Sequence, residues 1–246
     1  MNIDLKGKRA LVCGSTQGIG KAIAILFAEM GANVILMARD EAKLVAVLAK
    51  LPRNSDQEHD FLVADFQQPK QVEKTITTYL QRNKLIHVLI NNTSGPSTGP
   101  LLSKSSDELI GCMDQHLICS HILANAVVPV MKRTKYGRII NITSNAAKQP
   151  LANMGLSNVV RGAISNWSKT LANELGGYGI TVNNVLPGAT DTAELHRVIK
   201  DKADKLGKTE AEVILNMYSL CPAQRFAEPQ EIAWAVGFLA SPQAAY

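Results

Sequence analysis

Short apolar runs alternate along the chain with segments in which apolar residues recur every three or four positions. The apolar runs predict buried strands at residues 9–14, 32–38, 59–65, 86–92, 137–144 and 179–188. Helices are predicted between them at residues 20–31, 40–51 and 71–81, then as a long stretch from the end of the fourth strand to Met131, and at 162–175. The stretch Met154–Trp167 is predicted as the opening of a buried helix. This alternation is typical of a parallel sheet with helices on both faces. The fold class expected is therefore α/β, with one doubly wound parallel sheet.

One segment breaks the alternation. Residues 190–221 are rich in Lys, Glu and Ala and are too long for a plain connection, so they predict a helical lid over a binding site. The chain has no linker rich in Pro, Gly or Ser and no internal repeat. We therefore expect a single domain over residues 1–246.

Composition and charge exclude several classes of partner. The chain is 46% hydrophobic and 19% charged, and its formal charge of +5 is dispersed among acids with few aromatic residues, which argues against a nucleic-acid surface. The most apolar segment, residues 117–131, is shorter than a bilayer span and contains His121 and Asn125, so it predicts a core helix. Four scattered cysteines and the absence of an apolar leader favour the cytoplasm. We expect a small-molecule substrate, and neither nucleic acid nor membrane as a partner.

A glycine-rich loop follows the first predicted strand. Gly14, Gly18 and Gly20 open the first helix, where glycines let the backbone approach a pyrophosphate and the helix N-terminus favours anions. At the end of the second strand, a carboxylate would usually hold the ribose of NAD, but Ala38 and Arg39 stand there. Arg39 fits a 2′-phosphate, which predicts NADP(H) over NAD(H). The alternative is that Arg39 is a solvated turn residue.

Several motifs in order resemble the short-chain dehydrogenase/reductase family, and within it the 3-oxoacyl-acyl-carrier-protein reductases. They are the glycine spacing, Asp65 in "VADF", "NNTSG" with Thr93 in place of the family's alanine, "NITS" and "VNNVLPGATDT". The resemblance implies a Rossmann-type fold, hydride transfer between NADP(H) and a carbonyl or secondary alcohol, and a homodimer or homotetramer. The cofactor site implied by the loop and the resemblance comprises Gly14, Ser15, Gln17, Gly18, Ile19, Gly20, Arg39, Asp65, Asn91, Gly95, Arg161, Pro187, Gly188 and Thr192.

The catalytic positions implied by the resemblance are mostly changed. The family uses a serine, a tyrosine, a lysine and an asparagine, and Ser144 alone matches. Ser157 occupies the tyrosine position, Arg161 the lysine position and His116 the asparagine position. An alcohol is a much weaker acid than a phenol, and an arginine that stays protonated serves as a clamp. His116 can titrate near neutrality, so it is the replacement with acid/base capacity, unless it is a hydrogen-bonded histidine in a packed helix.

Two further groups of residues could have a role at the site. Cys112, His116 and Cys119 share one helix face and could present metal ligands, but no fourth ligand stands at a suitable spacing, so no metal is expected. Tyr218, in the predicted lid, either swings a phenol over the cofactor or packs the lid. Packing is the favoured interpretation.

Two hypotheses about function follow. The first is an NADP(H)-dependent oxidoreductase in which Ser144 orients the substrate oxygen, Arg161 anchors the ribose, and water or His116 supplies the proton. The alternative is an NADP(H)-binding protein with little or no turnover, acting as a sensor or a partner subunit. The family pattern also continues into a last strand that is absent from this chain, which leaves the oligomeric state open.

Overall fold

The computed structural model describes residues 3–54, 56–82 and 85–246. Within them, six parallel strands form one sheet in the order β3-β2-β1-β4-β5-β6. The chain order reverses between β1 and β4, as in a doubly wound fold. The predicted fold class is confirmed. The strands are β1 (Arg9–Cys13), β2 (Asn33–Ala38), β3 (Asp60–Val63), β4 (Val88–Asn91), β5 (Gly137–Ile142) and β6 (Ile180–Val185).

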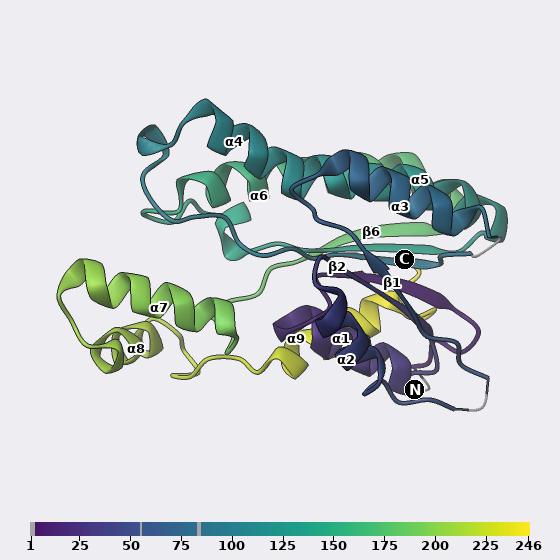
Figure 1. Ribbon diagram of the computed structural model, residues 1–246, viewed down its shortest axis with the longest axis horizontal. Coiled ribbons are helices and arrows are strands. Elements are labelled where there is room, and N and C mark those ends of the chain that lie inside the picture. The colour runs from purple at the N-terminus through teal and green to yellow at the C-terminus, as the bar shows by residue number, and fades with distance from the viewer. Residues whose placement is uncertain (1–2, 55, 83–84) are drawn as a thin grey trace.

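Helices cover both faces of the sheet (Figure 1). The helices are α1 (Gly18–Glu29), α2 (Glu41–Leu48), α3 (Pro69–Leu80), α4 (Ser106–Met113), α5 (Cys119–Thr134), α6 (Gly155–Leu175), α7 (Ala193–Leu206), α8 (Glu210–Ser219) and α9 (Pro229–Ala240). α1, α2 and α9 lie on one face, and α3, α5 and α6 lie on the other.

Each face of the sheet has its own apolar core because neighbouring residues of a strand point to opposite sides. Val12 of β1 packs in one core with Phe27 of α1, and Leu11 packs in the other with Val127 of α5. Every residue of β4 and β5 is buried, which is why these strands show no alternation of apolar and polar positions.

Two helix predictions need correction. Residues 93–131 do not form one helical stretch, because two prolines and two glycines in "GPSTGP" interrupt it and α4 begins only at its Ser105 capping box. A π-helical turn, Asp114–Ile118, then joins α4 to α5. α6 begins at Gly155, as the predicted opening at Met154–Trp167 indicates, and not at Gly162, since Asn158 pairs with both backbone groups of Leu151 and fixes the entry of the helix.

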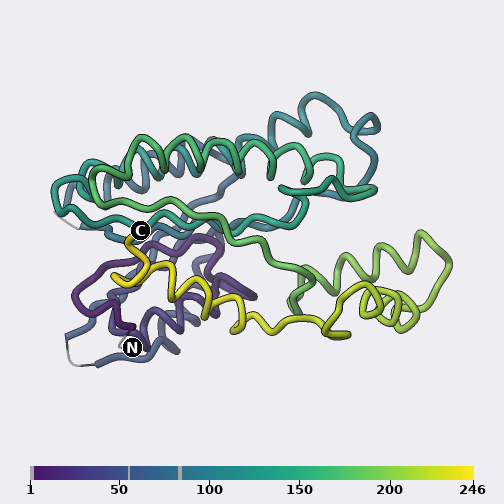
Figure 2. Tube along the Cα trace, turned by 180° about the vertical axis from the view of Figure 1, so that it is seen from behind, coloured from purple at the N-terminus to yellow at the C-terminus, as the bar shows by residue number. Residues whose placement is uncertain are grey.

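The predicted lid is helical, with α7 and α8 extending away from the sheet layers; the trace in Figure 2 shows the same projection from behind. Its small core contains Ile199 and Phe226, and the ring of Tyr218 packs edge-on against Phe226 with centroids 4.7 Å apart. Tyr218 therefore packs the lid, as favoured from the sequence. Lys205 of α7 also donates to Thr98 Oγ1 at 3.3 Å, which ties the lid to the loop after β4.

Membrane-spanning length and apolarity are not combined in any helix of the residues that the structure describes. The longest helix is α6, and polar residues are spread along it.

Candidate active site

The carboxyl ends of the parallel strands meet at one edge of the sheet, and the predicted site residues follow these ends. Gly14 follows β1, Arg39 follows β2, Asp65 comes shortly after β3, and Ser144 comes shortly after β5. In open α/β sheets the ligand crevice lies outside these ends, where the strand order reverses. The sheet therefore brings together segments that are more than 100 residues apart in the sequence.

The glycine-rich loop is packed so closely that side chains are excluded. A Cβ at Gly20 would lie 2.2 Å from the Gly14 carbonyl oxygen, and one at Gly14 would lie 2.6 Å from the Asn92 carbonyl oxygen. Gly14 and Gly18 also have positive φ angles of 59° and 53°. The loop thus needs glycine for its own conformation, and it leaves the N-terminus of α1 exposed to an anion.

Asn92 is a member of the site that the sequence reasoning missed. Its Nδ2 donates to the carbonyl oxygens of Cys13 and Gly14, both at 3.3 Å, so it clamps the loop from β4. The second asparagine of "NNTSG" was the available signal.

The other loop residues hold the loop in place. Ser15 is fully buried, and its Oγ accepts from the backbone N–H of Met37 at 3.1 Å, which joins the loop to β2. Gln17 is the exposed N-cap of α1, and Ile19 packs against the core.

The end of β2 carries an exposed cation. Arg39 is exposed and makes no ion pair with any described residue, whereas the next residue, Asp40, caps α2 by accepting from the Lys43 N–H at 3.0 Å. The Asp40 carboxylate is thus engaged by α2. After β3, Asp65 is half-buried and accepts from the Gln67 N–H at 3.0 Å.

Asn91 lies inside the sheet and not in the crevice. Its Nδ2 donates to Asn141 Oδ1 at 2.8 Å, and Asn141 Nδ2 in turn donates to Asn184 Oδ1 at 3.1 Å. The three asparagines stand in register on β4, β5 and β6. Asn91 therefore holds the strands beneath the site.

The start of α7, at the base of the lid, lies against two of the predicted cofactor loops. Thr192 caps α7 by accepting from the Leu195 N–H at 3.2 Å, and its methyl group would lie 3.1 Å from a Cβ at Gly18. Glu194 Oε1 would lie 3.2 Å from a Cβ at Gly95. Pro187 is half-buried and Gly188 is exposed just after β6.

Ser144 is half-buried and caps the short 3₁₀ turn Asn145–Ala147. Its Oγ accepts from the Ala146 N–H at 3.2 Å and donates to Asn145 Oδ1 at 3.0 Å. A substrate oxygen could therefore accept the hydroxyl hydrogen of Ser144 only if the bond to Asn145 were broken.

Ser157 and Arg161 are both buried on α6, and the structure gives them different surroundings. The Ser157 hydroxyl has no hydrogen-bond partner among the described residues. Arg161 donates from Nη1 to the Ile142 carbonyl oxygen at 3.0 Å and has no carboxylate within 4 Å in the described part of the chain. Burial lowers the pKa of Arg161 to about 10, so it remains a cation at neutral pH. A buried cation without an anion is costly.

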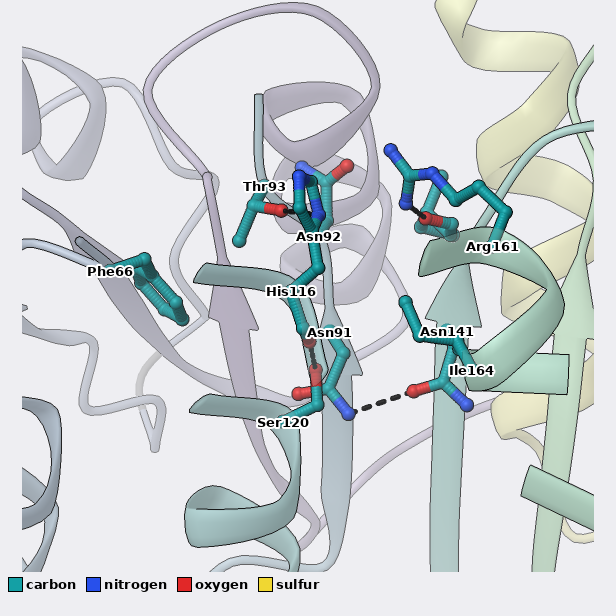
Figure 3. Close-up of a pocket in the computed structure, with 10 residues that line it drawn as sticks. Phe66, Asn91, Asn92, Thr93, His116, Ser120, Asn141, Arg161 and Ile164 are labelled. Carbon is teal, nitrogen blue, oxygen red and sulfur yellow. Dashed lines mark hydrogen bonds between the residues drawn. The ribbon is translucent and has the colours of Figure 1, made fainter. Parts of the chain in front are cut away.

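His116 does not titrate near neutrality, and that expectation was wrong. The side chain is buried in the π-helical turn, and burial, followed by the charge of Arg161, lowers its pKa to about 3. Its Nδ1 lies 2.7 Å from Oγ1 of Thr93, a partner that the sequence reasoning did not assign (Figure 3). The hydrogen-bonded alternative for His116 is the one the structure shows.

Two of the three side chains considered as metal ligands are engaged elsewhere. His116 Nδ1 pairs with Thr93, and Cys119 donates from Sγ to the Phe66 carbonyl oxygen at 3.2 Å. Residues 3–54, 56–82 and 85–246 contain no group of three side chains suited to hold a metal ion.

Comparison with known proteins agrees with this geometry. Residues 8–203 match the family model for short chain dehydrogenases. The 3-oxoacyl-[acyl-carrier-protein] reductase FabG of Vibrio harveyi is 32% identical over 246 residues, covering 99% of this chain and 94% of that protein. The crystal structure of L-sorbose reductase from Gluconobacter frateurii with NADPH and L-sorbose superposes with a TM-score of 0.92 at 28% identity, covering 100% of this chain and 94% of that one. The chain therefore belongs to the short chain dehydrogenase family of oxidoreductases and is related within it to the 3-oxoacyl-acyl-carrier-protein reductases.

Proposed function

We propose that this protein is an NADP(H)-dependent oxidoreductase that acts on a carbonyl or secondary alcohol, of the 3-oxoacyl class of its relatives. The observation that carries the proposal is the glycine loop, in which a Cβ at Gly14 or Gly20 would meet backbone oxygen, beside the exposed Arg39. The solved structures of the sorbose reductase and of an actinorhodin polyketide ketoreductase both contain NADPH.

The residues present fit such a cofactor. The N-terminus of α1 would hold the pyrophosphate and Arg39 would pair with the 2′-phosphate, and Thr192 lies across the loop at the base of the lid. Arg161 presents a buried positive charge to acceptor oxygens of the ligand. When bound, NADPH supplies the hydride for carbonyl reduction.

The protein's own groups restrict the origin of the proton. Ser157 is a weak acid, Arg161 keeps its proton, and His116 stays neutral because its pKa lies at about 3. In the proposed reaction, Ser144 orients the substrate oxygen and solvent water is the proton source.

The second candidate is an NADP(H)-binding protein with little or no turnover, acting as a sensor or a partner subunit. It is favoured by one observation: the position expected to carry a phenol carries Ser157, a buried residue whose hydroxyl has no hydrogen-bond partner in the described residues. Cofactor binding is common to both candidates, so turnover separates them.

The test is a titration of NADPH by intrinsic fluorescence, followed by NADPH oxidation with a panel of carbonyl compounds that includes 3-oxoacyl thioesters. We expect saturable binding and oxidation that depends on substrate and falls in Ser144→Ala. Binding without oxidation on any substrate supports the second candidate. A protein that is folded but does not bind NADPH contradicts both.

A further inference from the structure

Arg161 is a buried cation whose charge no described residue balances. The residue is 7% exposed, and the one hydrogen bond that it makes to the described residues goes from Nη1 to the Ile142 carbonyl oxygen. Burial lowers the pKa of Arg161 to about 10, and the next influence is the thiol of Cys112. Burial raises the pKa of that thiol, so it is neutral and supplies no counter-charge. A ligand with a negative charge would offset the cost of burying this cation.

The cavity beside Arg161 adds no negative charge either. Arg161 lines a small polar cavity together with Asn92, Thr93 and His116, and none of the lining residues is an aspartate or a glutamate (Figure 3). His116 is neutral, because burial and then the charge of Arg161 lower its pKa to about 3. The positive charge of Arg161 therefore acts on this end of the crevice without being cancelled.

One nitrogen of the Arg161 guanidinium is open to a ligand. Nε is enclosed by the protein and has no partner in the described residues, and Nη1 is used by Ile142. Nη2 also has no partner in that part of the chain, but it is not among the enclosed atoms. In Figure 3 the guanidinium lies at the same end of the cavity as Asn92, which clamps the glycine loop. The cavity itself has room for about one water molecule, so a larger group reaches Nη2 from the crevice.

The phosphates of the cofactor are assigned to other groups. In the proposed function they lie at the N-terminus of α1, which follows β1, and at Arg39, which follows β2. Arg161 is bonded to the end of β5, and β4 lies between β5 and β1 in the sheet. The negative charge at Arg161 therefore belongs to the substrate. A guanidinium matches the single charge of a carboxylate, whereas a phosphate ester carries about −1.5 to −2 charges.

We infer that Arg161 binds a carboxylate of the substrate through Nη2–H, and that the preferred substrate is a 3-oxo acid with a free carboxylate and not a neutral thioester. The carboxylate supplies the charge that the buried guanidinium lacks, and the pair forms a charge-assisted hydrogen bond. The assignment of this anion to a substrate rests on the proposed function, whereas the anion site on Arg161 does not.

The test compares two probes by isothermal titration calorimetry. Acetoacetate and methyl acetoacetate share the 3-oxoacyl skeleton and differ in negative charge, and NADP⁺ is bound first so that no hydride is available. We expect acetoacetate to bind at least about tenfold more tightly than the ester, and Arg161→Gln to remove the difference. Lys169→Gln, which removes an exposed cation of the same helix, is the matched control and should keep it. Equal affinities for the two probes, or a preference that survives in Arg161→Gln, overturn the inference.

Thermal unfolding without ligand checks that the variants fold. We expect Arg161→Gln to unfold at the same temperature as the unaltered protein or higher, since it no longer buries an unbalanced charge. If Arg161→Gln does not fold, Arg161→Lys decides, because it keeps the charge and loses the planar group. Acetoacetate should then bind more weakly than to the unaltered protein and still more tightly than the ester. A lysine variant without this preference overturns the inference.

A further pair of titrations separates this inference from the proposed function. If the protein does not bind NADP⁺, the proposed function fails, and acetoacetate and its ester titrated into the free protein decide the anion site. If Arg161→Gln weakens the binding of NADP⁺ and leaves that of acetoacetate unchanged, the anion is a phosphate of the cofactor and the inference is overturned. A folded protein that binds acetoacetate neither with nor without NADP⁺ overturns it too.

Discussion

Arg161 of α6 donates from Nη1 to the carbonyl oxygen of Ile142, the last residue of β5, at 3.0 Å. The bond fixes a buried cation at the carboxyl end of the sheet, where the crevice lies. A lysine at this position would carry a compact ammonium and would lack the planar guanidinium group. It could therefore not keep this bond to Ile142 and also offer further N–H donors to a ligand.

The exchange of Ser157 and Arg161 for the family's residues tests whether the chemistry was replaced or lost. In the double variant Ser157→Tyr with Arg161→Lys, we expect the native activity to disappear while NADPH remains bound, because the ammonium lacks the fork of the guanidinium. Steady-state kinetics and NADPH titration measure the two effects, and circular dichroism checks that the buried position 157 accepts a phenol. A double variant that gains 3-oxoacyl reductase activity, when the unaltered protein has none, would instead support the nucleotide-binding candidate. Either single change should then gain less, since the amine lowers the pKa of the phenol.

Arg39 is expected to determine the preference for NADPH. Arg39→Ala should weaken NADPH binding about tenfold or more, because an ion-paired hydrogen bond to the 2′-phosphate is lost, and should leave NADH binding unchanged. The preference of the unaltered protein should decline as salt is raised. Fluorescence titration with both cofactors measures this, and Lys50→Ala, an exposed cation just after α2, is the control. Equal affinities in the unaltered protein would remove this role from Arg39.

Two glycine-to-alanine changes should have opposite effects. Gly20→Ala places a Cβ 2.2 Å from the Gly14 carbonyl oxygen, so we expect a loss of about 1–3 kcal/mol in the free energy of unfolding and the loss of NADPH binding. Gly162→Ala, inside α6 with no atom within 4 Å of the new Cβ, should stabilise the protein by about 0.5–1 kcal/mol. Urea unfolding measures both. A Gly20→Ala protein that binds NADPH normally would contradict the close packing of the loop.

Buried histidines should make the protein less stable in mild acid. Burial is the main cause that lowers the pKa of His59, His87 and His116 below 6.5, and Nδ1 of His59 and of His87 each accepts a backbone N–H, which requires a neutral ring. The unfolded chain therefore binds these protons more readily, and stability falls as the pH drops below about 6.5. It continues to fall towards the folded-state values, about 3 for His116.

Urea unfolding at several pH values measures this effect. Between about pH 7 and pH 5 we expect a loss of at least about 2 kcal/mol. Carboxylates contribute only at lower pH: the pKa of Glu231 is lowered from 4.5 to about 2, chiefly by its bond with Arg225. In His116→Gln the drop between pH 7 and pH 5 should shrink. A stability that is constant over this range would contradict the buried, neutral state of the histidines.

The outer face of α9 is expected to mediate self-association. Trp234 is 60% exposed and Phe238 is 44% exposed, one helical turn apart, and exposed aromatic side chains so grouped are typical of interfaces. Sedimentation equilibrium should give a dimer or tetramer mass, and Trp234→Glu with Phe238→Glu should lower it. A monomer mass for the unaltered protein would contradict this prediction.

The parallel sheet, its doubly wound arrangement and the glycine-rich loop could be predicted from the sequence. Apolar runs such as residues 137–144 predict buried strands because both faces of a parallel strand are covered, and that information is local. Gly14, Gly18 and Gly20 were identifiable for the same reason, since a positive φ or a close backbone approach leaves only glycine possible. Arg39 could be placed because it directly follows the end of a predictable strand.

The pKa and the hydrogen bonds of His116, in contrast, depend on the tertiary structure. His116 has an ordinary sequence context, and its lowered pKa arises from burial and from Arg161, 45 positions later in the chain. Its pairing with Thr93 and the cavity shared with Asn91 bring together β4, the π-helical turn and α6. Burial and through-space charge depend on packing between distant segments, and no local pattern in one sequence records them.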